Sequence, residues 1–422
     1  MLDIKFIREN REVIKEASRK KCLDFNIDEL IEIDEKRREI LQKVENLRAE
    51  QNEANEKVKN LAGTPEKESI IIEMKKVKDQ LQKDESELKE IMDRWKSLMV
   101  KVPNIPDMSV PEGKNEDDNQ ELKQVGQKPQ FSFVPKDHVE LMTDLDLADF
   151  ERGVKTHGFR GYFLKNQGAR LSFALWNYGM DFFLKKGFQL FLPPAIVKKE
   201  YFYGTGHLPN EAEDLYVTQD DDYLSGTGEV SMMAYHADEI LKKENLPLRY
   251  LAFSPCYRRE AGSYGKDTKG LLRVHEFYKL EQLVLGPADH QSSVDLHEEL
   301  QRNHEEFLES LGLPYRQILI SSGDLSASKV KQYDTDLWIP SQKVYREIGS
   351  ASYYHDFQCR RFNIKYRDGD QTLYAHSLNA TAIPTPRSLI SLLECNQQED
   401  GSVIIPEVLR PYMGGEDKIH RL

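Results

Sequence analysis

The sequence is poor in cysteine. Four of its 422 residues are cysteines, at positions 22, 256, 359 and 395, and no two of them form a Cys-x-x-Cys pair. A disulfide framework or a zinc ribbon needs closely spaced cysteines, so the sequence predicts neither. Scattered thiols are typical of proteins in a reducing compartment, and we therefore expect a cytoplasmic protein without zinc.

Long apolar runs are also missing. Hydrophobic residues make up 39% of the chain, but they form no continuous stretch of about 18, so no membrane-spanning helix is predicted. The opening MLDIKFIRENRE is charged from its third residue and lacks the apolar core of a signal peptide. A membrane partner is therefore not expected.

The common nucleotide-binding and hydrolytic motifs are absent. The sequence contains no GxxxxGK[ST], so no P-loop is expected, and no HExxH or nucleophile elbow. The stretches GTGHLP, at 204–209, and GTGEV, at 226–230, lack the third glycine of a GxGxxG fingerprint. Any chemistry on nucleotides must therefore use a different arrangement of residues.

The chain lacks an excess of positive charge. Its formal net charge is −13, which argues against a protein that coats nucleic acid with its whole surface. Lysine and arginine nearly balance aspartate and glutamate over residues 1–100, so most of the negative charge lies in the remainder. The sequence therefore favours residues 1–100 for any contact with a polyanion. A length of 422 residues predicts two or three domains.

Two arms of a heptad repeat dominate residues 28–100. Apolar residues recur at alternating spacings of four and three on both sides of Gly63-Thr64-Pro65, a combination that ends one helix and starts another. The pattern predicts an antiparallel coiled-coil hairpin, roughly 50 Å long. A dimerisation coil or a simple spacer would show the same repeat. Residues 3–21 have the pattern of a short amphipathic helix that precedes it.

The rest of the chain mixes helical and strand patterns. The proline-rich, acidic segment 101–130 is predicted to be a linker, and residues 131–422 a further domain that contains a long helix at 168–186. Alternating residues predict strands at 336–350, 361–367 and 371–378. Because short turns join several strands, we expect an antiparallel sheet and the fold class α+β.

Residues 253–284 carry an unusual set of side chains. The stretch FSPCYRREAGSYGKDTKGLLRVHEFYKLEQLV is predicted to form a strand, a long loop and a second strand. Because side chains alternate along a strand, Arg273, Phe277 and Glu281 would share one face of the second arm, and Arg258 and Glu260 one face of the first. Taken alone, these charges are also typical of the wet face of a half-exposed sheet.

A helix start with an arginine follows in NATAIPTPRSLISLLECNQ, at 379–397. Thr385 can cap a helix that has Pro386 at its first position, which places Arg387 in the first turn. An arginine beside a helix N-terminus is suited to bind phosphate. The sequence therefore predicts an anion-binding position here.

Three stretches, at about 187–196, 253–284 and 379–397, resemble the signature motifs 1, 2 and 3 of class II aminoacyl-tRNA synthetases. Over the whole chain the sequence resembles the seryl-tRNA synthetase family of the bacterial type. The further segments that carry this resemblance are MLDIKFIREN, the hairpin, VPNIP, GTGHLP, Thr227-Gly228-Glu229, YREIGSAS, DFQCRR and PEVLRPYMGG. The resemblance implies that L-serine is activated with ATP to seryl-adenylate and pyrophosphate, and is then transferred to the 3′ end of tRNA(Ser).

The resemblance also implies site residues. Arg258 and Arg387 would be catalytic, with Arg258 on the α-phosphate and serine carboxylate, and Arg387 stacked on adenine opposite Phe277. Glu260 would accept from the adenine amino group, and Arg273 would meet the γ-phosphate. The implied serine-binding residues are Thr227, Gly228, Glu229, Arg258, Glu281, Asn379 and Thr381. The implied ATP-binding residues are Arg258, Arg259, Glu260, Arg273, Val274, Phe277, Glu347, Ile348, Gly349, Ser350 and Arg387.

Mg²⁺, held by Glu347 and Ser350, is the metal that the resemblance implies. Residues 1–100 would form a tRNA-binding domain and residues 131–422 the catalytic domain of a homodimer. The hairpin would reach across the dimer to the long variable arm of tRNA(Ser). The loop at 261–270 would close on ATP and meet the tRNA acceptor end.

The third motif departs from the family pattern. Asn379-Ala380-Thr381-Ala382 stands where members often have Asn-Gly-Ser-Gly, and Pro386 where glycine is common. The additional methyl of Thr381 predicts a tighter exclusion of threonine. A non-catalytic, RNA-binding paralogue and an enzyme that transfers serine to another carrier are the alternatives. The presence of Arg258, Glu281, Glu347 and Arg387 argues against the first, and the hairpin argues against the second.

Overall fold

The structure is a computed structural model that describes residues 1–60, 65–263, 265, 267 and 269–421. The chain divides into two compact units. The smaller unit holds Leu2–Arg19 and Leu23–Pro103, and the larger one holds Met1, Lys20–Cys22 and Asn104–Leu422. Within the described ranges, none of the helices is long and apolar enough to cross a membrane.

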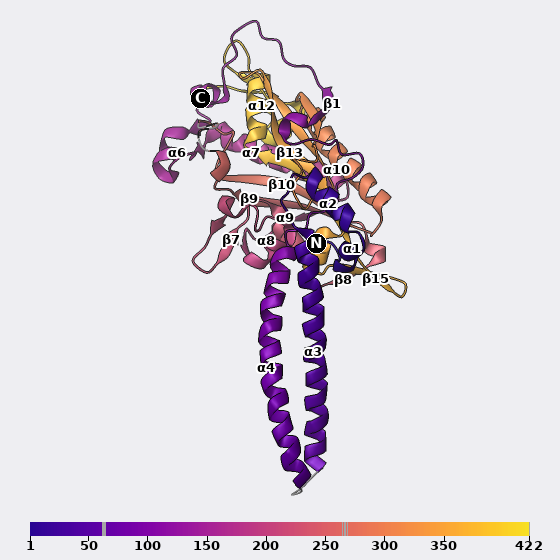
Figure 1. Cartoon of the computed structure of the whole chain (residues 1–422). Coiled ribbons are helices and arrows are strands. Elements are labelled where there is room, and N and C mark those ends of the chain that lie inside the picture. The colour runs from indigo at the N-terminus through magenta and orange to yellow at the C-terminus, as the bar shows by residue number, and fades with distance from the viewer. Residues whose placement is uncertain (61–64, 264, 266, 268, 422) are drawn as a thin grey trace. The chain divides into compact units, whose positions relative to one another are not determined.

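The smaller unit is helical. Two short helices, α1 (Ile4–Glu9) and α2 (Arg11–Lys20), replace the single helix predicted over 3–21, because the chain leaves helical geometry at Asn10, the C-cap of α1. The long helices α3 (Ile27–Asn60) and α4 (Pro65–Met99) run side by side in opposite directions (Figure 1). The predicted turn at 63–65 falls largely on residues 61–64, which lie outside the described residues.

The predicted heptad seam holds this hairpin together. Ile40, Val44 and Leu81 are buried in one apolar cluster between the helices, with Leu88 packed against it. Full burial of such a side chain contributes about 1.5–3 kcal/mol. Asp84 also lies on the seam, where it is buried and accepts a hydrogen bond of 2.6 Å from Gln80. The predicted coiled coil is therefore confirmed.

An eight-stranded sheet forms the centre of the larger unit. The strand order is β1-β11-β12-β13-β16-β10-β9-β4, and all neighbours are antiparallel except β4 and β9. The strands, in this order, are Gln120–Val125, Tyr315–Leu319, Lys331–Ile339, Val344–Tyr353, His376–Thr385, Glu276–Gly286, Leu248–Tyr257 and Gln189–Phe191. The predicted α+β class is confirmed.

The structure differs from the sequence prediction in the segment 101–130. This segment contains β1 at the edge of the sheet, and the Asn104 side chain donates hydrogen bonds to the carbonyls of Ser328 and Tyr354 at 3.0 and 2.8 Å. The strand has the sequence QELKQV, and five of its six residues are exposed. An edge strand with polar side chains on both faces has no apolar alternation, which is why the sequence pattern did not indicate it.

The longest helices that pack on the sheet are α7 (Asn166–Lys185), α10 (His290–Ser310) and α12 (Arg387–Asn396). The helix predicted at 168–186 corresponds to α7. Gly179 allows α7 to approach the sheet, because a Cβ there would lie 2.2 Å from Ile383 Cδ1 and 3.1 Å from Leu280 Cδ1. This helix therefore covers the face of β10 to which Leu280 points, and the other face remains for polar side chains.

Shorter elements surround this core. The short helices are α5 (His138–Asp144), α6 (Phe150–His157), α8 (Lys199–Thr205), α9 (Gly228–Ala234) and α11 (Phe357–Phe362). The short strands are β2 (Ala148–Asp149), β3 (Phe163–Leu164), β5 (Ile196–Lys198), β6 (Tyr216–Val217), β7 (Asp222–Leu224), β8 (Ile240–Lys242), β14 (Lys365–Asp368), β15 (Gln371–Tyr374), β17 (Val403–Ile404) and β18 (Lys418–Ile419). The strand predicted over 361–367 was therefore wrong at its start, where α11 ends.

Candidate active site

Three side chains of β10 share the face that points away from α7. Phe277, Lys279 and Glu281 occupy alternate positions, so they lie on one side of the strand. Glu281 is paired with Ala252 on β9 and with Thr381 on β16, where a bulge shifts the register after Leu280. Bulges often re-aim a side chain next to a functional site.

Glu281 is the centre of a buried polar cluster. It is 3% exposed and accepts hydrogen bonds from the Thr227 hydroxyl, from the Gly228 amide at 3.0 Å and from Asn379 Nδ2 at 3.3 Å. Its carboxylate lies 3.0 Å from Lys279 Nζ. Burial alone would raise the pKa of Glu281, but Lys279 and the donated hydrogen bonds hold this pKa below its usual value. A buried carboxylate that stays charged can bind an ammonium group.

Sequence reasoning missed Lys279. Its Nζ donates to the Thr227 hydroxyl at 3.0 Å, and the residue is 5% exposed. A lysine is rarely buried unless it is paired, which here is achieved by Glu281. Its position, two residues from both Phe277 and Glu281, was the signal that could have revealed it.

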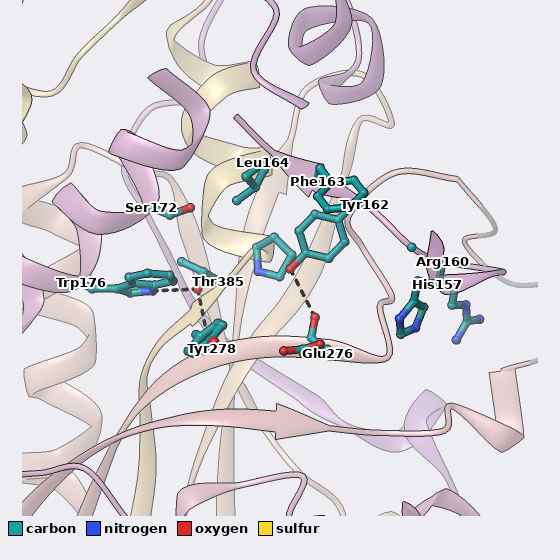
Figure 2. A pocket seen from close by; sticks show the side chains of 12 residues that line it. His157, Arg160, Tyr162, Phe163, Leu164, Ser172, Trp176, Glu276, Tyr278 and Thr385 are labelled. Carbon is teal, nitrogen blue, oxygen red and sulfur yellow. Dashed lines mark hydrogen bonds between the residues drawn. The ribbon is translucent and has the colours of Figure 1, made fainter. Parts of the chain in front are cut away.

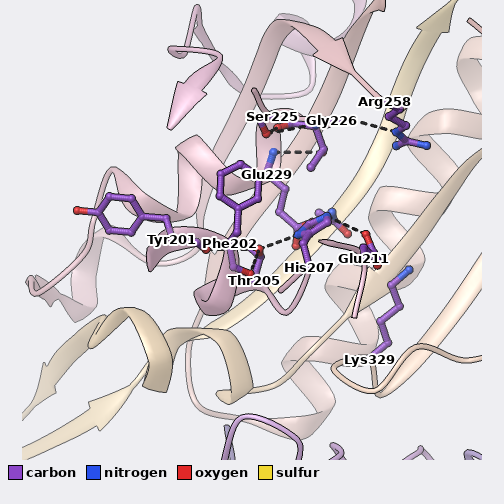
Figure 3. Close-up of polar contacts among 12 residues, drawn as sticks. Tyr201, Phe202, Thr205, His207, Glu211, Ser225, Gly226, Glu229, Arg258 and Lys329 are labelled. Atoms are coloured by element: carbon purple, nitrogen blue, oxygen red, sulfur yellow. Dashed lines mark hydrogen bonds and ion pairs between the residues drawn. The ribbon is translucent and has the colours of Figure 1, made fainter. Parts of the chain in front are cut away.

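The start of α9 places a second carboxylate nearby. Thr227 is the N-cap of α9 and accepts from the amide of Glu229 at 3.3 Å, which puts Glu229 in the first turn. Glu229 is 5% exposed, and burial raises its pKa, while His207 and a hydrogen bond from Gln358 oppose this rise. Figure 3 shows Glu229 beside His207, whose Nδ1 lies 2.7 Å from the Thr205 hydroxyl.

The two arginines predicted to be catalytic lie near each other, and Arg258 lies beside Phe277 of β10. The Arg258 guanidinium is 5.4 Å from the ring centre of Phe277, and its Nε donates to the Gly226 carbonyl at 3.3 Å (Figure 3). Arg387, at the start of α12, donates to the carbonyls of Leu272 and Glu347 at 2.9 and 2.6 Å. Burial lowers the pKa of Arg387; the negative charge of Glu347 opposes this, and the nearby Arg258 and Arg273 lower the pKa further. This crowding of positive charge suits a polyanionic ligand.

Glu260 and Arg273 form an ion pair. Arg273 Nη1 lies 3.0 Å from Glu260 Oε2, and its Nε donates to Asp267 at 3.3 Å. Arg160 Nη1 is 3.7 Å from the same Glu260 oxygen. Arg273 precedes β10, which begins at Glu276, so the predicted strand alternation does not extend to it. The path of the loop between β9 and β10 brings Arg273 next to Glu260 instead.

Two predicted ATP-binding residues, Arg259 and Val274, differ from Arg258 in where their side chains lie. The amide of Arg259 donates to the Asp214 carbonyl at 2.9 Å, and its side chain is exposed. Val274 is 4% exposed and belongs to the hydrophobic core. Any ligand contact of Val274 would therefore have to use its backbone.

The four β13 residues that were predicted to bind ATP lie at a bulge. Glu347 and Gly349 pair with Asp336 and Thr335 on β12, and the register shift leaves Ile348 between them; Ser350 pairs with Asp334. Burial raises the pKa of Asp334, and the negative charge of Glu347 raises it further. Oxygen ligands of this kind suit Mg²⁺, and a divalent cation would relieve the repulsion.

Gly349 leaves room for Thr381. A Cβ at Gly349 would lie 2.6 Å from Thr381 Cβ and 2.8 Å from Thr381 Cγ2, so the threonine methyl rests where only a glycine fits. Thr381 is 7% exposed, whereas Ala380 and Ala382 are part of the hydrophobic core. The two alanines that replace the family's glycines are thus accommodated by core packing.

The predicted cap of α12 was wrong. The Thr385 hydroxyl donates to the Tyr278 carbonyl at 2.9 Å and accepts from Trp176 Nε1 at 2.8 Å, while Pro386 is the N-cap residue of a helix that begins at Arg387. The hydroxyl is directed to β10 and α7 because these elements pack against β16, a contact that the local sequence does not contain.

These contacts border a cavity of about 270 Å³ (Figure 2). Its walls include Tyr162, Trp176 and Tyr278. Tyr278 alternates with Phe277 and Lys279 and therefore points to the opposite face of β10. The cavity is thus separate from the polar cluster around Glu281.

Comparisons with known proteins show which family the chain belongs to. The family model "Seryl-tRNA synthetase N-terminal domain" matches residues 1–106, and "tRNA synthetase class II core domain (G, H, P, S and T)" matches residues 216–396. The serine–tRNA ligase of Deinococcus radiodurans is 42% identical, over 99% of this chain and 98% of the relative. That of Petrotoga mobilis is 44% identical, over 99% of both chains.

Solved structures show the same similarity. The seryl-tRNA synthetase of Pyrococcus horikoshii, solved with ATP, has a TM-score of 0.89 and 36% identity, covering 100% of both chains. The cytoplasmic serine–tRNA ligase of Naegleria fowleri, solved with AMP, has a TM-score of 0.87 and 32% identity, covering 100% of this chain and 99% of the other. The chain belongs to the seryl-tRNA synthetase family of class II aminoacyl-tRNA synthetases and is a serine–tRNA ligase.

Proposed function

We propose that serine is activated and passed to tRNA(Ser) at the polar face of β10, with serine at Glu281 and ATP beside Arg258, Phe277 and Arg387. The observation that supports this most directly is the cluster around Glu281. A carboxylate that is 3% exposed and yet held in its charged form is arranged for a cationic group, and serine carries one.

Serine would be held at both of its polar ends. Glu281 and Glu229 would receive the ammonium group, and Thr227, Asn379 and Thr381 would line the pocket around the hydroxyl. The Gly228 amide and Lys279 would keep Glu281 in place. A site built to hydrogen-bond a hydroxyl rejects an analogue without it, because buried polar groups would stay unpaired. Alanine is therefore expected to be a very poor substrate.

The activation step needs little proton transfer. An oxygen of the serine carboxylate, already deprotonated, attacks the α-phosphorus of ATP, and the bond to the pyrophosphate oxygen breaks. Arg258 would bind the α-phosphate and the serine carboxylate, and Arg387 would add positive charge at the phosphates. Phe277 would offer its ring to adenine, and Glu260 would accept from the adenine amino group. Catalysis would rest on positioning and charge stabilisation.

ATP would also contact the ends of this arrangement. Arg273 would reach the γ-phosphate, and the backbone of Arg259, Val274, Ile348 and Gly349 would complete the site. Glu347 and Ser350 would hold Mg²⁺, which neutralises phosphate charge. The raised pKa of Asp334 beside Glu347 supports this, because the carboxylates gathered there repel one another. Few protein ligands suffice, since Mg²⁺ takes its remaining ligands from phosphates and water.

The hairpin, at about 28–100, would recognise tRNA(Ser) as the main part of a tRNA-binding domain of residues 1–100, which is joined to the catalytic domain at 131–422. Its two long helices present alternating charges on their exposed sides, with exposed ion pairs such as Arg48–Glu85 at 2.7 Å. The loop at 261–270 would meet the acceptor end. A dimerisation coil or a spacer remains the alternative for the hairpin.

A homodimer would form through motif 1. Large apolar side chains are exposed along α7 and the strands that follow it, although exposed apolar surface is costly in water. They are Phe173 at 61%, Leu184 at 42%, Leu190 at 40%, Leu192 at 77% and Ile196 at 57%. A second copy of the chain would cover them. The cytoplasmic location remains a prediction.

Two assays test the proposed site. Serine-dependent exchange of pyrophosphate into ATP measures activation, and charging of tRNA(Ser) with labelled serine measures transfer. Absence of exchange would favour the non-catalytic paralogue. Exchange without charging of tRNA would favour another acceptor of the seryl group.

Replacing Thr381 by serine is expected to weaken the rejection of threonine by roughly tenfold. The Thr381 methyl rests against Gly349 and fixes the side-chain rotamer, so its removal frees both space and the hydroxyl. The ratio of kcat/KM for serine and threonine in pyrophosphate exchange measures this. Thr385→Ser on the same strand is the control and should change the ratio less than twofold. An unchanged ratio in Thr381→Ser would show that the methyl plays no part in selection.

A further inference from the structure

Gln358 lies at the centre of a buried hydrogen-bonded cluster next to the proposed serine pocket. It is in the first turn of α11 and is 1% exposed. Its Nε2 donates to Glu229 Oε1 at 2.8 Å and to the Thr205 carbonyl at 3.3 Å, and its Oε1 accepts from the Ser377 hydroxyl at 2.7 Å. Both ends of the amide are therefore used.

These contacts join three elements. Thr205 is the last residue of α8, Glu229 is in the first turn of α9, and Ser377 is on β16. Because side chains alternate along a strand, Ser377 is on the same face of β16 as Asn379. Gln358 thus fixes Glu229 relative to the strand that carries Asn379 and Thr381.

We propose that Gln358 is a positioning residue of the serine pocket, which holds the Glu229 carboxylate in the orientation that receives the serine ammonium group. The proposal rests on the assignment of Glu229 to serine binding. The Gln358 amide supplies a donor to Glu229 and an acceptor to Ser377 at once. A glutamate here would turn acceptors toward Glu229 and Thr205, and a methionine would offer no donor.

The hydrogen bond from Gln358 also affects the charge of Glu229. Burial raises the pKa of this carboxyl, and the hydrogen bond from Gln358 is one of the influences that lower it. The other charged or titratable groups near it are His207, Glu281, Lys329 and Tyr354. Without the amide donor, Glu229 would take up a proton at a higher pH and lose its attraction for an ammonium group.

The test measures pyrophosphate exchange in Gln358→Met and Gln358→Glu, with serine and ATP varied separately between pH 6 and 9. We expect the KM for serine to rise about tenfold to a hundredfold in Gln358→Met, the scale of one hydrogen bond to a charged group, and the KM for ATP to change less than twofold. As the pH is lowered, Gln358→Met should begin to lose serine binding at a higher pH than the unchanged protein. The KM for serine of Gln358→Glu should be highest at high pH and should fall again as the pH is lowered. A proton shared between the carboxyls of residues 358 and 229 then restores a donor to Glu229.

Gln397→Met is the matched control. Gln397 is 2% exposed, and its amide also donates to two acceptors, the carbonyls of Lys136 and Glu394, and accepts one hydrogen bond, from the Lys136 amide. This variant should lose a comparable amount of thermal stability and keep its KM for serine. A serine effect in both variants would show that Gln358 acts only through general stability.

Glu229→Gln separates failure of the inference from failure of the proposed site. If Glu229→Gln leaves the KM for serine unchanged, the assignment of Glu229 is wrong. If Glu229→Gln raises it but Gln358→Met does not, Gln358 is not a positioning residue. If Gln358→Met does not fold, the pH-dependent recovery of Gln358→Glu decides, and its absence overturns the proposal.

Discussion

Replacing Arg258 by lysine is expected to lower kcat/KM for serine-dependent pyrophosphate exchange by about a thousandfold. Arg258 directly follows β9, and its guanidinium lies 5.4 Å from the ring centre of Phe277 on β10. Its Nε donates a hydrogen bond to the Gly226 carbonyl at 3.3 Å. This contact leaves the two terminal nitrogens to grip two oxygens of the α-phosphate and the serine carboxylate at once. A lysine keeps the charge but cannot make this paired contact.

Arg249→Lys is the control for this prediction. Arg249 is on β9, the strand that ends just before Arg258, and makes a paired contact with Glu299, at 3.0 and 2.9 Å. Its replacement should cost a partly exposed ion pair and leave the exchange rate within about twofold. A loss below about tenfold in Arg258→Lys would contradict the catalytic role, because one strong transition-state contact is worth more than that.

Shortening the hairpin is expected to abolish charging of tRNA(Ser), by at least a hundredfold in kcat/KM, while pyrophosphate exchange stays within about twofold of the full-length chain. Replacement of residues 51–77 by a short glycine-rich turn would remove the last 10 residues of α3 and the first 13 of α4, or roughly 15–20 Å of the rod. The seam residues Ile40, Val44, Leu81 and Leu88 remain, so the shortened hairpin keeps its packing.

The same variant tests the alternatives for the hairpin. A spacer would tolerate the deletion in both assays. If the hairpin is a dimerisation coil, the deletion would convert the protein to a monomer, and light scattering would show the lower mass in solution. An equal loss of exchange and charging would contradict the separation of serine activation from tRNA recognition.

Local sequence was sufficient where a pattern repeats along one element. The heptad spacing predicted α3 and α4, because the contact between two helices depends on side chains three and four positions apart. Alternation and turns predicted the antiparallel sheet, and the apolar stripe predicted α7 to within two residues at its start. Where the pattern was weak, as in β1 and at Asn10, the prediction missed a strand or a helix break.

Strand alternation in residues 253–284 and the helix start before Arg387 singled out part of the candidate site, but the roles of its residues came from resemblance to a family. Structure then showed contacts that neither had indicated: Lys279 against Glu281, Gln358 against Glu229, and Gly349 beneath Thr381. Their partners lie between 2 and 129 residues away in the chain, and even the nearest pair depends on the burial that neighbouring strands create. A sequence read one element at a time does not contain that information.

The sequence by itself determined the long helices, the antiparallel sheet, the coiled coil and, through its motifs, the family. Only the tertiary structure decided which way the polar side chains face and what holds them. Thr385 illustrates the reason: its sequence context is that of a helix cap, but the packing of α7 and β10 against β16 offers its hydroxyl two nearer partners. Hydrogen bonds in a buried site are set by whichever groups the fold brings together, and spacing along the chain does not limit that choice.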